Sequence, residues 1–134
     1  MTDRNYADKM KGRRGISRII NAAGYSRDGL SAAYRHESAF RQLVWLNILL
    51  VALAFILDFG PATRMMLIFA SFLSLIVELF NTAIEAAVDH TSTARHELAK
   101  RAKDAGSAAQ MLALLLLALL WFMSLWREYG LNLF

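Results

Sequence analysis

Three long apolar stretches restrict what this 134-residue chain can fold into. They cover residues 43–57, 65–88 and 105–126, and the first and the third contain no charged side chain. Hydrophobic residues make up 57% of the sequence, which is more apolar surface than one small soluble domain can bury. A helix needs about 20 apolar residues to cross a bilayer. The sequence therefore predicts an all-α membrane protein with three transmembrane helices.

Positive charge lies on one side of the predicted spans. Residues 1–42 contain nine Lys or Arg and residues 89–104 contain four, whereas residues 58–64 and 127–134 contain one each. The positive-inside rule therefore places the N-terminus and the 89–104 loop in the cytoplasm. A nucleic-acid partner is not expected, because no aromatic or helix-turn-helix pattern accompanies the basic residues. The chain has no cysteine, which excludes disulfides and thiolate nucleophiles.

The residues before the first span divide into two parts. Residues 1–15 are polar, basic and interrupted by glycine, and we expect them to form a flexible tail. Residues 16–42 are amphipathic, which predicts two short helices lying in the membrane interface. Residues 43–129 then form a single three-span domain.

Acidic residues share one face of the second span. Glu78, Asn81 and Glu85 are spaced i, i+3 and i+7, and Asp89 lies one turn further along. An ionised side chain near the centre of a bilayer costs on the order of 3 kcal/mol on insertion scales, and more by other estimates. Two carboxylates on one face of a membrane helix therefore indicate a function.

Spacing alone leaves three explanations for this face open. The side chains could bond neighbouring helices in an oligomer, carry protons or ions across the membrane, or catalyse a reaction at the interface. Depth favours catalysis, because Glu85 is expected near the cytoplasmic headgroups and Glu78 about two turns deeper. No polar residue of this span continues the path beyond Ser74 and Ser71. Such a gradient suits a site that joins a water-soluble reactant to a lipid headgroup.

Further candidate residues lie outside the second span. The segment 101–109 provides cations for phosphate groups, an acid for a nucleotide or a metal, and small residues for close helix packing. Glu37 is another candidate acid, on the expected interfacial helix. The phosphate-loop, dinucleotide-binding and protein-kinase motifs are all absent. A kinase with this sequence would therefore belong to none of the common soluble types.

Four segments of the sequence carry a family likeness. They are 17–26 (SRIINAAGYS), 37–42 (ESAFRQ), 78–89 (ELFNTAIEAAVD) and 96–109 (HELAKRAKDAGSAA). In this order and at this spacing they resemble the prokaryotic integral-membrane diacylglycerol kinases, a family of small three-span homotrimers. The resemblance implies an ATP-dependent kinase of the bacterial inner membrane that converts diacylglycerol to phosphatidic acid with the help of Mg²⁺.

The resemblance also implies roles for individual residues. Glu78 matches the catalytic base that takes the proton from the lipid hydroxyl, and Asn81 matches a polar residue of the same catalytic site. Glu37 and Glu85 match the pair that holds the metal bridging the ATP phosphates. The residues that match nucleotide contacts are Tyr25, Glu37, Glu85, His96, Lys103 and Asp104. Those that match positions near the lipid substrate are Arg18, Ser26, Glu78 and Ser107.

Departures from the family pattern fall at the periphery of this set. A basic residue is replaced by Asn21, an acid by Ala94, and aromatic residues by Arg27 and Ile56. The stretch 106–109 favours diacylglycerol as the acceptor over undecaprenol, which a related branch phosphorylates. A small proton-coupled transporter is the alternative from another functional class, although such a protein would usually need a fourth span.

Overall fold

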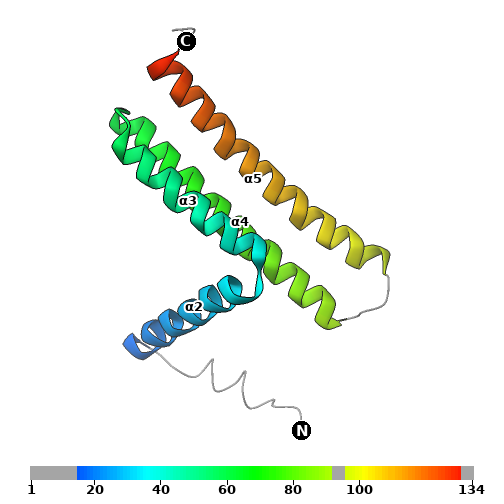
Figure 1. The fold of residues 1–134 in the computed structure, drawn as a ribbon. Helices are drawn as coiled ribbons and strands as arrows, with labels where there is room; N and C mark the ends of the chain where they lie inside the picture. Colours follow the sequence, from blue (N-terminus) through cyan, green and yellow to red (C-terminus); the bar gives the residue numbers. More distant parts are fainter. Residues whose placement is uncertain (1–14, 92–95, 131–134) are drawn as a thin grey trace. The chain divides into compact units, whose positions relative to one another are not determined.

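The computed structural model describes residues 15–91 and 96–130, and this part of the chain is built from helices without a strand (Figure 1). The helices are α2 (Ile16–His36), α3 (Ser38–Ile56), α4 (Pro61–Thr91) and α5 (Glu97–Tyr129). The expected tail falls almost wholly on residues 1–14, which lie outside the described residues. The 89–104 segment is helical at both ends, because α4 continues to Thr91 and α5 begins at Glu97.

The three predicted spans are confirmed. Helices α3, α4 and α5 are each long and apolar enough to cross a membrane. Helix α3 begins five residues before the apolar stretch that predicted it, and its 19 residues rise about 28 Å. That length is close to the roughly 30 Å of a bilayer core. Pro61 is the first residue of α4, a position where its missing N–H costs nothing.

The N-terminal amphipathic region is one helix, whereas the sequence suggested two. Helix α2 runs without interruption through Gly24 and Gly29. The Ser26 hydroxyl donates a hydrogen bond to the Ala22 carbonyl at 3.0 Å, so this polar side chain is satisfied inside the helix. Residues 38–42 belong to α3 and not to a second interfacial helix. Helix α2 forms a unit of its own that ends at His36.

The second unit begins at Glu37 and contains α3, α4 and α5. Helix α4 packs against both α3 and α5, and it runs antiparallel to each of them (Figure 1). The apolar core of this unit lies near the turn between α3 and α4, and its buried members are Ala54, Phe59, Leu67, Ala70, Leu117 and Trp121. We call this region, with the adjoining residues of the turn, the apolar end of the unit.

Several polar groups at the apolar end are paired, although the buried Nε1 of Trp121 has no hydrogen bond among the described residues. Arg64 donates from Nε to the Ala54 carbonyl at 2.8 Å and from Nη2 to the Phe59 carbonyl at 3.1 Å. The Asp58 backbone N–H donates to the Tyr129 hydroxyl oxygen at 3.0 Å, which ties the turn to the end of α5. Phe59 stands edge-on to Trp121, with ring centroids 5.8 Å apart. These contacts fix the connection between the first two spans.

Large apolar side chains also cover the outside of this unit. Phe69, Phe72, Leu112 and Phe122 each expose more than half of their surface, from 58% to 62%. An exposed apolar surface of this extent is untenable in water and suits contact with lipid or with further membrane helices. The exposed faces of α4 and α5 therefore agree with the membrane assignment.

Candidate active site

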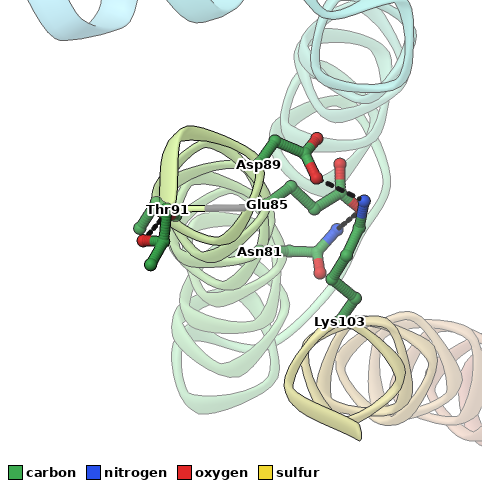
Figure 2. A network of polar contacts seen from close by, with 6 residues as sticks. Asn81, Glu85, Asp89, Thr91 and Lys103 are labelled. Atoms are coloured by element: carbon green, nitrogen blue, oxygen red, sulfur yellow. Dashed lines mark hydrogen bonds and ion pairs between the residues drawn. The ribbon is translucent and has the colours of Figure 1, made fainter. Parts of the chain in front are cut away.

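The acidic face of α4 runs from a buried residue to an exposed one. Glu78 is buried with 7% of its surface exposed, Asn81 and Glu85 are half-buried, and Asp89 is exposed. Figure 2 shows Asn81, Glu85 and Asp89 pointing to the same side of α4. The acidic face that the sequence periodicity predicted therefore extends from a buried position, Glu78, to an exposed position near the end of α4, Asp89.

A cation from α5 meets this face. The Lys103 ammonium group lies 2.9 Å from Oδ1 of Asp89, as drawn in Figure 2. Asn81 donates from Nδ2 to Oε1 of Glu85 at 3.4 Å, a long and weak bond. Asp104, the neighbour of Lys103, pairs instead with Lys100 at 2.6 Å on the exposed side of α5. The structure therefore brings Lys103 to the acidic face and directs Asp104 to another partner.

Gly106 allows α5 to approach Asn81 closely. A Cβ atom built at Gly106 would lie 2.5 Å from Oδ1 of Asn81, so any larger residue would force the amide to move. Oδ1 of Asn81 is buried and accepts no hydrogen bond from the described residues. A buried acceptor without a donor is costly, and such atoms are uncommon in folded proteins. Asn81 is therefore held in place beside Glu85, with its Oδ1 enclosed against Gly106 in the contact between α4 and α5.

A third carboxylate approaches from α3. Glu37 precedes the first residue of α3, and its side chain makes no capping hydrogen bond to the helix. Glu37 and Glu85 both lie near enough to Glu78 to act electrostatically on its carboxyl group. Glu78 on α4 is thus acted on by two further carboxylates, one from α4 and one from the residue that precedes α3. Their mutual repulsion favours a cation or a proton among them.

The acidic residues suit a cation that brings other ligands with it. Among the described residues there is no group of three or more His, Asp or Glu side chains arranged to hold a metal alone. Mg²⁺ is commonly bound by one or two carboxylates together with substrate phosphates and water. Glu37 and Glu85 fit that kind of incomplete site, because carboxylate oxygens are the hard ligands that Mg²⁺ prefers.

A hollow of about 460 Å³ opens beside Glu78. Its lining comes from all three spans and consists of Ala39, Gln42, Leu43, Leu46, Glu78, Gln110 and Leu114. The lining is mostly apolar, and the volume is typical of small-molecule sites. A carboxylate in the wall of an apolar hollow between membrane helices is suited to meet the polar end of a lipid. Of the residues assigned from sequence, Glu78 is the one that lines this hollow.

The remaining predicted site residues are distributed over two helices. Arg18, Tyr25 and Ser26 all lie exposed on α2, in the unit that ends at His36. His96 is exposed immediately before α5, and Ser107 is exposed on α5 next to Gly106. Neither His96 nor Ser107 lines the hollow beside Glu78, and their roles stay predictions.

Sequence reasoning missed several buried polar side chains. Gln110 lines the hollow with 9% of its surface exposed. Asn47 donates from Nδ2 to the Ser74 hydroxyl oxygen at 3.0 Å, and the Ser74 hydroxyl donates to the Ser71 carbonyl at 2.7 Å. Amides inside charge-free apolar stretches were the available signal, because a polar residue at membrane depth needs a partner.

Comparison with known proteins gives consistent matches over most of the chain. The family model described as "Prokaryotic diacylglycerol kinase" matches residues 24–125. A diacylglycerol kinase of Pseudomonas aeruginosa is 53% identical over 111 residues, which cover 83% of this chain and 90% of that protein. The diacylglycerol kinase of Escherichia coli K12 is 47% identical over 116 residues, covering 87% and 95% respectively. That of Helicobacter pylori 26695 is 46% identical over 108 residues, covering 81% and 84%.

Proposed function

The chain belongs to the prokaryotic diacylglycerol kinase family, and on that premise we propose that it transfers the γ-phosphate of ATP to diacylglycerol. The products are phosphatidic acid and ADP. The observation that carries this proposal is the position of Glu78, buried in the wall of an apolar hollow between membrane helices. Such a position gives a carboxylate access to a lipid hydroxyl while the exposed end of the same helix face reaches toward water.

The reaction balances with Glu78 as the base. The lipid hydroxyl gives its proton to the Glu78 carboxylate, and its oxygen forms a bond to the γ-phosphorus. The bond between the γ-phosphorus and the bridging oxygen of the β-phosphate breaks, and ADP leaves with that oxygen. Asn81 stands between Glu78 and Glu85 along the face and donates from Nδ2 to Oε1 of Glu85, which helps to position that carboxylate. Phosphoryl transfer of this kind depends on positioning and charge neutralisation.

Nucleotide binding is assigned to the exposed end of the acidic face. Lys103 offers a positive charge to phosphate oxygens, and Glu37 with Glu85 would hold Mg²⁺. When bound, Mg²⁺ neutralises charge on the phosphates. The other nucleotide contacts that we propose, from the family pattern, are Tyr25, His96 and Asp104. For the lipid substrate we propose Arg18, Ser26 and Ser107 in addition to Glu78.

We further propose that the enzyme is a homotrimer of the bacterial inner membrane with its N-terminus in the cytoplasm. The apolar side chains exposed on α4 and α5 support an assembly of membrane helices, and the distribution of Lys and Arg supports the orientation. Chemical crosslinking in detergent should produce trimers, and a product consisting of monomers alone would contradict the assembly. Protease digestion of inverted membrane vesicles should cleave the N-terminal residues.

The activity is tested with ATP radiolabelled at its γ-phosphate in mixed micelles that contain both diacylglycerol and undecaprenol. The wild-type protein should label phosphatidic acid, and Glu78→Gln should lower kcat by about 10²- to 10⁴-fold because it removes the base. Glu128→Gln, the same change at an exposed residue of α5, is the matched control and should retain activity. Label found mainly in the polyprenol would move the enzyme to the related branch. Absence of label in both lipids would refute the kinase.

A further inference from the structure

Gln110 is a buried polar side chain for which the described fold supplies no partner. It lies in the apolar stretch of α5, and 9% of its surface is exposed. Its Oε1 is buried without a hydrogen bond, and its Nε2 forms none with the described residues. Because Oε1 is the enclosed atom, Nε2 is the end of the amide that can meet a group in the hollow, and an unpaired donor is costly at membrane depth where water does not substitute. The side chain therefore calls for a group that is brought in by a ligand.

The position of Gln110 identifies the site it serves. Gly106 of α5 lies against Asn81 of α4, and the two helices run antiparallel. One turn further along α5 from Gly106 is Gln110, and about one turn back along α4 from Asn81 is Glu78. The two side chains accordingly line the same hollow from opposite helices. An amide that can donate and accept hydrogen bonds thus stands across the hollow from the carboxylate that receives the lipid hydroxyl.

The chemistry of the lining decides which end of the amide is used. Diacylglycerol has one hydrogen-bond donor, its hydroxyl, and this donor is committed to Glu78 when the proton is transferred. The other polar groups of the lipid are ester oxygens, which only accept. Glu78 as a carboxylate only accepts as well, so an ester carbonyl in the hollow requires a donor from another residue. Gln110 provides one through its NH₂ group, and the last torsion of a glutamine side chain is broad enough to direct it there.

We propose that Gln110 donates a hydrogen bond from Nε2 to an ester carbonyl of the acceptor lipid. Gln110 is then a specificity-determining residue that favours lipid alcohols with a carbonyl close to the hydroxyl. This inference rests on the proposed function, and it adds a reason for the choice of a glycerol ester over a polyprenol. A polyprenol offers its hydroxyl alone and leaves the amide unpaired, which a polar binding site penalises.

The test compares two acceptors of equal chain length in mixed micelles, a diacylglycerol and the corresponding dialkylglycerol ether, which lacks both carbonyls. The wild-type enzyme should show kcat/KM about three- to tenfold higher for the ester, the worth of one hydrogen bond. Gln110→Met keeps the length of the side chain without its hydrogen bonds. It should raise KM for the ester by that factor, leave kcat/KM for the ether nearly as it was, and bring the ratio close to one.

The ratio of kcat/KM for the ester to kcat/KM for the ether distinguishes a loss of recognition from a loss of stability, because poor folding of a variant lowers both values equally. Leu115→Met changes an exposed leucine of α5 that does not line the hollow and should keep the wild-type ratio. Should Gln110→Met be inactive with both lipids, Gln110→Ala reads the same ratio. An ester preference that survives in the Gln110 variants, or that is lost in Leu115→Met, would overturn the inference. Equal use of both lipids by the wild type would also overturn the inference, but it would leave the proposed kinase activity intact. Activity with neither lipid would contradict the proposed kinase activity itself.

Discussion

The polar groups at the two ends of the α3–α5 unit differ in their contacts. At the apolar end, Arg64 donates to two backbone carbonyls and the Asp58 N–H meets Tyr129. At the other end, Asn81 and Gln110 keep buried oxygens without hydrogen bonds in the described part of the chain. Two carboxylates, Glu37 and Glu85, also act electrostatically on Glu78 there. The apolar end also keeps one buried donor without a partner among the described residues, Nε1 of Trp121, so the two ends differ mainly in the like charges gathered at the polar end. Like charges cost stability, and a ligand can supply the partner that they lack.

Buried contacts between the spans show the same contrast. Asn47 and Ser74 bond one another in the interface of α3 and α4, one turn away from Glu78. Glu78 itself has no side-chain hydrogen bond among the described residues and faces the hollow instead. Ser74 and Glu78 are therefore similarly buried but differ in their contacts. Ser74 bonds a partner within the fold, whereas Glu78 is left to meet the substrate. The comparison predicts that substitutions at the apolar end act on stability and those at the polar end on catalysis.

The largest expected effect is at the apolar end. Leu67→Ala removes a side chain that is 1% exposed in the core, and the cavity should lower the free energy of unfolding by about 2–5 kcal/mol. Activity per folded molecule should stay near the wild-type value, since Leu67 is remote from the hollow. Thermal unfolding in detergent, followed by circular dichroism, measures the loss. Leu112→Ala is the matched control, because a 62% exposed leucine leaves a gap that detergent fills.

The next effect is at the polar end and should have the opposite character. Glu85→Gln should lower kcat/KM by about 10²-fold at fixed Mg²⁺, because it removes charge that faces the phosphates and the cation. Raising the Mg²⁺ concentration should restore part of the rate. The unfolding temperature should not fall, since the substitution removes a charge that repels its neighbours. Glu97→Gln at the start of α5 serves as the control. A loss of stability without a change in Mg²⁺ dependence would contradict the prediction that substitutions at the polar end act on catalysis and not on stability.

The smallest of these effects tests the close approach of α5 to Asn81. Gly106→Ala adds one methyl group that must displace the Asn81 amide, and it should lower kcat by about tenfold through misplacement of that side chain. Stability should change little, since alanine favours the helix by about 0.5–1 kcal/mol over glycine and offsets the strain. Gly29→Ala adds the same group where no atom lies within 4 Å and should leave kcat unchanged. Equal rates for the two variants would show that the position of Asn81 is unimportant.

Local patterns in the sequence were enough for the outline of this protein. Hydropathy identified the three spans, and the family assignment made from four segments is confirmed by the comparisons. The same patterns misjudged some element limits. Residues 38–42 were included in the expected interfacial region, yet they belong to α3, which begins at Ser38. Likewise the amphipathic pattern predicted two short helices over residues 16–42, whereas α2 is one helix up to His36.

The sequence by itself determined that α4 carries Glu78, Asn81 and Glu85 on one face, because the period of a helix is a local property of the backbone. Only the tertiary structure decided what stands opposite that face. The pairing of Lys103 with Asp89, the contact of Gly106 with Asn81 and the shared hollow of Gln110 and Glu78 all depend on the register between α4 and α5. That register is set by side-chain packing along two long helices, and packing joins residues that no local pattern relates.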